Sequence, residues 1–264
     1  MAETIFMIHG MWAGAWVWDD YREFFENRGY ECVAPPLRFH DVPPGTEPDP
    51  RLGTTSLLDY AQDLENQISR LPTMPILMGH SMGGLLAQIL ASRGLARMLV
   101  LLTSAPPAGV IPAPCTVVNA GRLGMLPWSR SKAIRPTWQA AAGTVLQRMS
   151  PESQKKMYDG FGYESGLAAY EMGFWFLDPR RASWVDGAKV TCPVLAVAGK
   201  EDRLIPPFVV RQIARKYGSV STYKEFRDHG HMVNAEPGWQ GVANYIAEWL
   251  DLAGRRAALD HRAS

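Results

Sequence analysis

The chain has 264 residues, with 27 Lys or Arg against 26 Asp or Glu, so its formal net charge is +1. This length lies between one and two ordinary domains, and α/β folds often use as much chain in one domain. A hydrophobic fraction of 47% and a charged fraction of 20% are ordinary for globular proteins, which argues against disorder and fibrous repeats. The near-neutral balance gives no reason to expect nucleic acid or an anionic membrane surface as a partner.

Targeting and redox signals are weak. No run of about 18 apolar residues occurs, so we expect no membrane span. The N-terminus lacks the charged and long apolar regions of a secretory signal. Cys32, Cys115 and Cys192 are too few and too scattered for a disulfide framework or a metal site. We therefore expect a reducing, cytoplasmic setting, and the sequence implies no metal or organic cofactor.

Short apolar runs alternate with helical patterns along most of the chain. The first predicted strand covers residues 4–8 and ends at His9-Gly10. A continuous apolar run over residues 75–79, bounded by Pro and Gly, is typical of a strand that is buried on both faces. Further strands are predicted over residues 30–34, 96–103, 193–198 and 222–226, and helices over residues 16–28, 55–71, 85–92, 206–217 and 239–252.

This alternation predicts a parallel sheet that is covered by helices on both faces. Residues 106–187 break the pattern, because they contain helical patterns over 137–149 and 165–177, clustered aromatics and no convincing strand. We predict one α/β core formed by residues 1–105 and 188–264, with residues 106–187 as a helical cap inserted over the edge of the sheet.

The segment Gly79-His80-Ser81-Met82-Gly83 fits the pattern G-x-S-x-G between a predicted strand and a predicted helix. A sharp strand-to-helix turn of this kind forces the serine into strained backbone angles and lifts its hydroxyl above the sheet. The flanking glycines are needed because a Cβ there would collide with neighbouring backbone. We predict that Ser81 is a nucleophile; the alternative is a serine that merely caps a helix.

A serine hydroxyl needs a base to accept its proton. His229 and His231 follow the last predicted strand, and we prefer His231, which comes after Gly230. The two histidines could also be interpreted as metal ligands, but no third cluster of ligands supports this. His9 and His80 adjoin glycines and are expected to shape turns by hydrogen bonding.

The imidazole in turn needs a carboxylate that fixes its tautomer. Asp202 follows the predicted strand 193–198 and so lies at the carboxyl end of the sheet, where ligands bind in open α/β folds. Its neighbour Glu201 is the competing candidate. For the oxyanion, we predict backbone N–H donors from Met82, directly after the nucleophile, and from Met11 in the loop after the first strand.

Together these residues resemble the α/β-hydrolase superfamily over nearly the whole chain. The order Ser81, Asp202, His231 is the nucleophile–acid–histidine order of that superfamily. Residues 9–18, His-Gly-Met-Trp-Ala-Gly-Ala-Trp-Val-Trp, resemble more specifically the branch of plant methylesterases and hydroxynitrile lyases. The resemblance implies an α/β-hydrolase fold with about six mostly parallel strands and a small helical cap.

Two positions distinguish the esterases from the lyases of this branch. The resemblance implies Thr in the lyases where Gly10 stands, to bind the cyanohydrin oxygen, and Lys where Met232 stands, to manage the charge of cyanide. A site without that ammonium group has no obvious way to stabilise departing cyanide. The sequence therefore favours an esterase and disfavours a hydroxynitrile lyase.

The resemblance also places the cap over the substrate pockets. Apolar side chains at helical spacing are often core residues, but as a group they favour an apolar or aromatic substrate over a sugar. The residues that we expect to contact substrate are Trp12, Leu126, Trp128, Phe174, Trp175 and Met232.

We conclude from the sequence that the chain is a carboxylic ester hydrolase with an acyl-enzyme intermediate. Its expected partner is a small to medium apolar or aromatic ester, and the protein is expected to be a monomer or a homodimer. A lactonase, an amidase or a C–C bond hydrolase with the same triad remains open, as does a ligand receptor with slow turnover. Dehalogenases and epoxide hydrolases are disfavoured because they use Asp where Ser81 stands.

Overall fold

Six parallel strands form the central sheet in the order β2-β1-β3-β4-β7-β8. The computed structural model describes the backbone of residues 2–263 and the side chains of residues 2–255. The six strands are β1 (Thr4–Ile8), β2 (Glu31–Val33), β3 (Ile76–His80), β4 (Met98–Leu102), β7 (Val194–Gly199) and β8 (Ser221–Phe226). The predicted parallel sheet is therefore confirmed, with each predicted strand within a few residues of its place.

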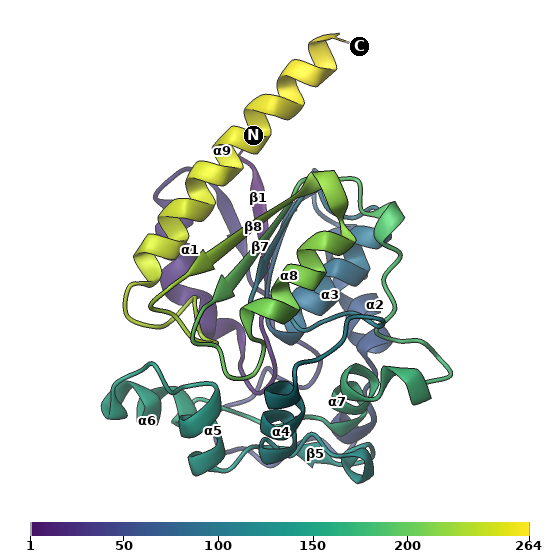
Figure 1. The fold of residues 1–264 in the computed structure, drawn as a ribbon, viewed down its shortest axis with the longest axis vertical. Coiled ribbons are helices and arrows are strands. Elements are labelled where there is room, and N and C mark those ends of the chain that lie inside the picture. The colour runs from purple at the N-terminus through teal and green to yellow at the C-terminus, as the bar shows by residue number, and fades with distance from the viewer. Residues whose placement is uncertain (1, 264) are drawn as a thin grey trace.

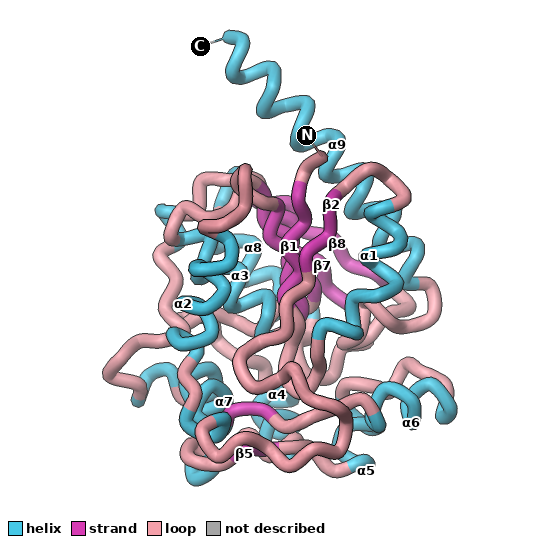
Figure 2. The backbone as a smooth tube through the Cα atoms, turned by 180° about the vertical axis from the view of Figure 1, so that it is seen from behind, coloured by secondary structure: helices cyan, strands magenta, loops and turns pink. Residues whose placement is uncertain are grey.

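Helices cover both faces of this sheet, as Figures 1 and 2 show. One face carries α1 (Asp19–Glu26) and α9 (Trp239–Ala263). The other face carries α2 (Leu57–Ile68), α3 (Met82–Ser92) and α8 (Pro207–Lys216). Helix α9 continues beyond the predicted end at residue 252, and its last turns project from the body of the molecule (Figure 1). No helix in the described part of the chain is long and apolar enough to cross a membrane.

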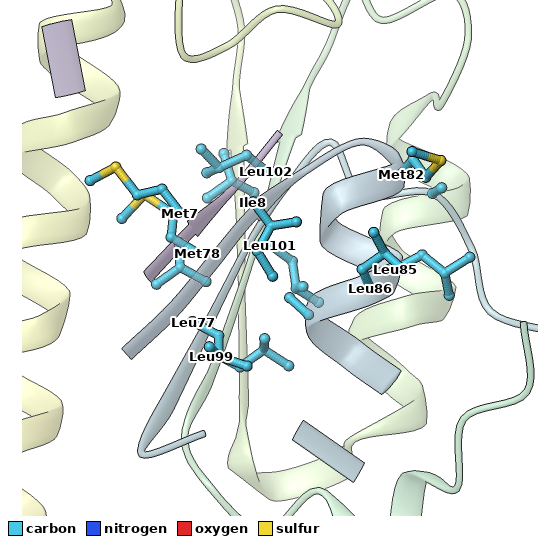
Figure 3. Packing of buried hydrophobic residues seen from close by; sticks show 14 of the residues in the cluster. Met7, Ile8, Leu77, Met78, Met82, Leu85, Leu86, Leu99, Leu101 and Leu102 are labelled. Carbon is cyan, nitrogen blue, oxygen red and sulfur yellow. The ribbon is translucent and has the colours of Figure 1, made fainter. Parts of the chain in front are cut away.

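The core lies between the sheet and these helices. Every residue of β1, β3, β4 and β7 is buried, which explains why these strands are almost continuously apolar. Successive side chains of a strand point to opposite faces, so Leu101 faces α3 while Leu102 faces the side of α9 (Figure 3). Helix α3 is nearly all buried, including Leu85 and Leu86.

The chain between β4 and β7 folds into a separate layer over the carboxyl ends of the strands (Figure 1). This layer contains α4 (Pro114–Arg122), α5 (Trp138–Thr144), α6 (Pro151–Asp159) and α7 (Gly166–Gly173). It also contains β5 (Ala133–Ile134), which pairs antiparallel with β6 (Glu164–Ser165). The prediction that this segment has no strand was wrong, because strands of two residues are too short to leave an alternating pattern.

Two buried carboxylates attach this layer to α2. Glu171 of α7 accepts a hydrogen bond of 2.7 Å from the hydroxyl of Ser56, which itself caps α2. Glu164 of β6 accepts a hydrogen bond of 2.6 Å from Tyr60 of α2, and its other oxygen lies 3.2 Å from Nε2 of His40. Both carboxylates are shielded from water, so these hydrogen bonds connect the layer to α2 through a low-dielectric interior, where they are strong.

Candidate active site

Ser81 lies in the turn between β3 and α3. Its backbone angles are φ +53° and ψ −120°, a strained conformation for a residue with a side chain. A Cβ on Gly79 would lie 2.3 Å from the carbonyl oxygen of Gly83, and one on Gly83 would lie 2.1 Å from that of Ile8. The turn can therefore close only with glycine at both positions, which is the collision that the sequence pattern predicted.

The structure brings Ser81, His231 and Asp202 together in one hydrogen-bonded series. The Ser81 Oγ lies 3.1 Å from Nε2 of His231, and Nδ1 of His231 lies 2.8 Å from Oδ2 of Asp202. All three side chains are buried. Because a carboxylate only accepts, Nδ1 carries the proton and Nε2 is free to accept the proton of the Ser81 hydroxyl.

The carboxylate of Asp202 is oriented by backbone amides of the residues that follow it. Its Oδ1 accepts hydrogen bonds of 2.8 Å from the amides of Leu204 and Ile205, which leaves Oδ2 for the imidazole. The competing Glu201 instead has an exposed carboxylate that pairs with Arg148 at 3.3 Å.

The other histidine of the last loop has a different environment. His229 packs against the ring of Phe226, with ring centroids 5.6 Å apart, and burial lowers the pKa of its imidazole. Among the described residues, no group of three or more His, Cys, Asp or Glu side chains could hold a metal ion.

His9, directly after β1, and His80, at the end of β3, both make hydrogen bonds to backbone groups. Nδ1 of His9 donates to the carbonyl of Gly10 at 2.9 Å, while Nε2 accepts from the amide of Leu37 at 3.1 Å. Nε2 of His80 donates to the carbonyl of His231 at 2.9 Å. Burial and neighbouring histidines lower the pKa of His9 to about 4 and that of His80 to about 3, so both are neutral at pH 7.

The two predicted oxyanion donors belong to segments that adjoin each other and Ser81. Met82 is the first residue of α3, so its N–H is one of the unpaired amides of a helix N-terminus, where negative charge is favoured. Met11 follows Gly10 in the loop after β1. A Cβ on Gly10 would lie 2.9 Å from Cβ of Ser81, so this loop and the serine turn are in direct contact. Both Met11 and Met82 line the cavity next to Ser81.

That cavity has a volume of about 140 Å³ and is mainly apolar. Three of the expected substrate contacts, Trp12, Phe174 and Trp175, line it. Its wall also contains Met125 and residues that the sequence analysis did not identify, namely Thr116, Val117, Ala120, Leu204 and Ile205. Three of these belong to α4, and the spacing of 116, 117 and 120 on one helix face was the available signal.

The other three expected contacts do not line the cavity. Trp128 is 71% exposed in the short 3-10 turn Pro127–Ser129, because this turn directs its ring outward from the cap. Leu126 is partly buried, and Met232, which directly follows His231 in the chain, is buried. Their contact with substrate stays a prediction.

Trp12 has a second environment on its other side. It also lines a cavity of about 420 Å³, together with Trp16, Phe39, His40 and prolines of the loop after β2. Trp12 adopts φ +64°, and its indole N–H donates to the carbonyl of Ile134 in the cap at 3.2 Å. Trp12, which follows Met11, thus contacts both cavities and the segment between β4 and β7.

Comparisons with known proteins agree with the fold described above. A family model described as the alpha/beta hydrolase family matches residues 5–244. Among curated proteins, the chain is 25% identical over 218 residues to Protein ABHD8 of Bos taurus and to that of Homo sapiens. These matches cover 77% of this chain and 46% and 45% of the relatives, so the chain spans about half the length of the curated relatives it matches.

Similar solved structures cover almost the whole chain. The methylesterase MES16 from Arabidopsis is 13% identical, with a TM-score of 0.72 over 95% of this chain and 100% of that one. A pyrethroid hydrolase from Sphingobium faniae JZ-2 is 20% identical, with a TM-score of 0.72 over 95% and 98%. The monoacylglycerol lipase of Paleococcus ferrophilus is 21% identical, with a TM-score of 0.71 over 95% and 94%. At these identities the likeness establishes a shared fold.

Proposed function

Since the chain belongs to the alpha/beta hydrolase family, we propose that it is a carboxylic ester hydrolase that works through an acyl-enzyme. The observation that carries this proposal is the buried series of hydrogen bonds from Ser81 through His231 to Asp202. It supplies the three parts that acyl transfer by a serine requires: a nucleophile, a base within reach of its proton, and a carboxylate that orients the base.

In the proposed reaction, the Ser81 oxygen attacks the ester carbonyl while Nε2 of His231 accepts the hydroxyl proton. The amides of Met11 and Met82 donate to the carbonyl oxygen as it becomes negative. His231 then protonates the departing alcohol. A water molecule enters, gives a proton to His231 and attacks the acyl-enzyme, which releases the acid and restores Ser81.

The cavity supports an apolar substrate of small to medium size. Apart from Ser81 and Thr116, its lining side chains are apolar or aromatic, and none carries a charge. The names of the structural relatives, a methylesterase, a pyrethroid hydrolase and a monoacylglycerol lipase, favour ester hydrolysis. We infer that the chain is an esterase related to the plant methylesterase branch.

Two features count against hydroxynitrile lyase chemistry. A threonine at position 10 would require its neighbours to shift, because a Cβ there would lie 2.9 Å from Cβ of Ser81 and 3.1 Å from the carbonyl oxygen of His80. Position 232 holds a buried methionine in place of a lysine ammonium. A lactonase, an amidase or a C–C bond hydrolase would use the same residues, and a slow ligand receptor would retain them.

The test is steady-state hydrolysis of p-nitrophenyl acetate, butyrate, octanoate and laurate by the wild type and by Ser81→Ala. We expect multiple turnovers by the wild type and a fall of kcat by several orders of magnitude in the variant. Near-wild-type turnover by a clean Ser81→Ala preparation would disprove the proposal. Absent turnover in the wild type, combined with strong stabilisation by a lactone or another ligand, would favour a restricted substrate or a receptor.

A further inference from the structure

Four side-chain hydrogen bonds converge on the backbone around His231. The carbonyl oxygen of His231 accepts one from Oγ1 of Thr103 at 2.7 Å and one from Nε2 of His80 at 2.9 Å. Both donors are themselves buried. Thr103 follows the end of β4 and His80 is the last residue of β3, so the two central strands of the sheet hold this carbonyl.

The backbone N–H groups on either side of His231 both donate to one carboxylate, that of Glu236. Oε2 of Glu236 accepts from the N–H of Gly230 at 2.6 Å, and Oε1 accepts from the N–H of Met232 at 3.0 Å. Glu236 has no exposed surface. A Cβ on Gly230 would lie 3.0 Å from Oε1, so glycine allows this carboxylate its close approach. The backbone of the loop is therefore fixed on both sides of the imidazole.

The backbone of Thr103 adopts a conformation that is unfavourable for a β-branched residue, and its hydrogen bond to His231 is made from this conformation. Thr103 adopts φ +41°, a region that β-branched residues rarely occupy and that persists only where the surroundings determine it. Its amide donates to the carbonyl of Val197 at 2.9 Å, which continues the pairing of β4 with β7. With its backbone fixed in this way, Thr103 directs its hydroxyl at the His231 carbonyl.

We propose that Thr103, His80 and Glu236 form a clamp that positions His231 relative to Ser81; the clamp rests on the proposed roles of Ser81 and His231. The three residues are absent from the lining of the cavity next to Ser81, so they are positioning residues and do not touch substrate. A base must stay within hydrogen-bond reach of its proton, and a displacement of about 1 Å can cost roughly 100-fold in rate.

Thr103 offers a matched pair of variants. Thr103→Val keeps the shape of the side chain and removes the donor, whereas Thr103→Ser keeps the hydroxyl. We expect Thr103→Val to lower kcat about tenfold with KM within about twofold, since the cavity is unchanged, and Thr103→Ser to retain most of kcat. Equal kcat values for the valine and serine variants would overturn the proposal for Thr103.

Glu236→Gln tests the other side of the loop, because a glutamine has one acceptor oxygen for the two amides. We expect a lower kcat and faster hydrogen exchange at the Gly230 and Met232 amides, with exchange in β3 and β4 unchanged as a check on folding. Glu201→Gln, which changes an exposed carboxylate, is the control and should change neither kcat nor the exchange of these two amides. Unchanged exchange at both amides would overturn the clamp.

The exchange measurement separates failure of the clamp from failure of the proposed function. If the wild type shows no turnover that depends on Ser81, the proposed function fails, but faster exchange in Glu236→Gln still supports the clamp. If the wild type is active and Glu236→Gln changes neither exchange nor kcat, the clamp fails while the function stands. Should Glu236→Gln not fold, the Thr103 pair decides the question.

Discussion

The Asp202 carboxylate has three partners, two backbone amides on Oδ1 and the imidazole of His231 on Oδ2. The amides fix its orientation, so an asparagine there can keep its oxygen towards the amides and turn its NH₂ towards the imidazole. This amide would donate to Nδ1 and move the imidazole proton to Nε2, where it blocks proton transfer from Ser81.

We therefore expect Asp202→Asn to lower kcat by roughly 10³- to 10⁴-fold with little loss of stability. Glu201→Gln is the matched control, because Glu201 is adjacent in sequence but pairs with Arg148 at the surface. The measurement is kcat for a p-nitrophenyl ester together with the thermal midpoint. If Glu201→Gln lowers kcat more than Asp202→Asn does, the acid that orients His231 is not Asp202.

Gly10 is restricted by its neighbours more than by its own conformation. Gly10→Ala would place a methyl group 2.9 Å from Cβ of Ser81 and 3.1 Å from the carbonyl oxygen of His80, so the loop that carries Met11 must move away. We expect kcat to fall at least tenfold, since donors of this kind are sensitive to small displacements. In the control, Gly121→Ala, the added methyl group is 3.8 Å from its nearest neighbour. Full activity in Gly10→Ala would show that the Met11 amide is not needed.

At the scale of elements, the sheet could be predicted because its strands are buried on both faces and therefore leave continuous apolar runs. Helix α3 was expected to begin at Leu85 but begins at Met82, because the glycines that are weak helix formers are required there by close packing. Helix α4 was missed because Thr116, Val117 and Val118 are β-branched, and such residues are weak helix formers.

Helix α6 was missed for a different reason. It has no buried residue, so no hydrophobic face marks it in the sequence. Its start does carry a local signal: Ser150 caps the amide of Ser153, and Pro151 occupies the first helical position. The candidate catalytic residues could be named because each follows a strand within a recognisable motif. Their supports could not, because Thr103 is 128 residues from His231 and only the fold brings them together.

The ion pair between His40, in the loop after β2, and Glu164 of β6 should contribute to stability in a pH-dependent way. Burial opposes charge on both partners, yet the Glu164 carboxylate holds the pKa of His40 above 6.5, and His40 with Tyr60 holds the pKa of Glu164 below 4.5. Because the pKa of His40 is raised on folding, charged His40 stabilises the fold fully below pH 6.5. This stabilisation is lost as the pH rises through the pKa that His40 has in the folded protein. The lowered pKa of Glu164 stabilises it above pH 4.5, and this contribution is lost on acidification.

The pair should therefore contribute most between pH 4.5 and 6.5. We expect His40→Gln to lower the free energy of unfolding by roughly 3 kcal/mol in this window, because a buried carboxylate loses its counter-charge, and by less at pH 9. Urea titrations across the pH range measure the difference. Arg38→Gln removes the half-exposed pair with Asp63 and should cost under about 1 kcal/mol. A loss that does not diminish towards pH 9 would contradict this assignment.

For the molecule as a whole, Trp12 is placed where two cavities meet one side chain, because it lines both the cavity of about 140 Å³ and the cavity of about 420 Å³. We expect Trp12→Ala to join these cavities and to shift the preferred p-nitrophenyl ester towards longer acyl chains. Trp128→Ala serves as the control, since the exposed ring of Trp128 lies outside both linings. A chain-length optimum that is the same in Trp12→Ala and the wild type would show that the cavities stay separate.

The positions of the site residues along the chain also have a consequence for synthesis. Ser81 is made early, the cap follows it, and Asp202, His231 and Glu236 come only in the last quarter. Strands β7 and β8 must then join the edge of a sheet whose other four strands are already available. Under the proposed function, the triad is therefore incomplete until the chain has been made beyond His231 and β7 and β8 have joined the sheet.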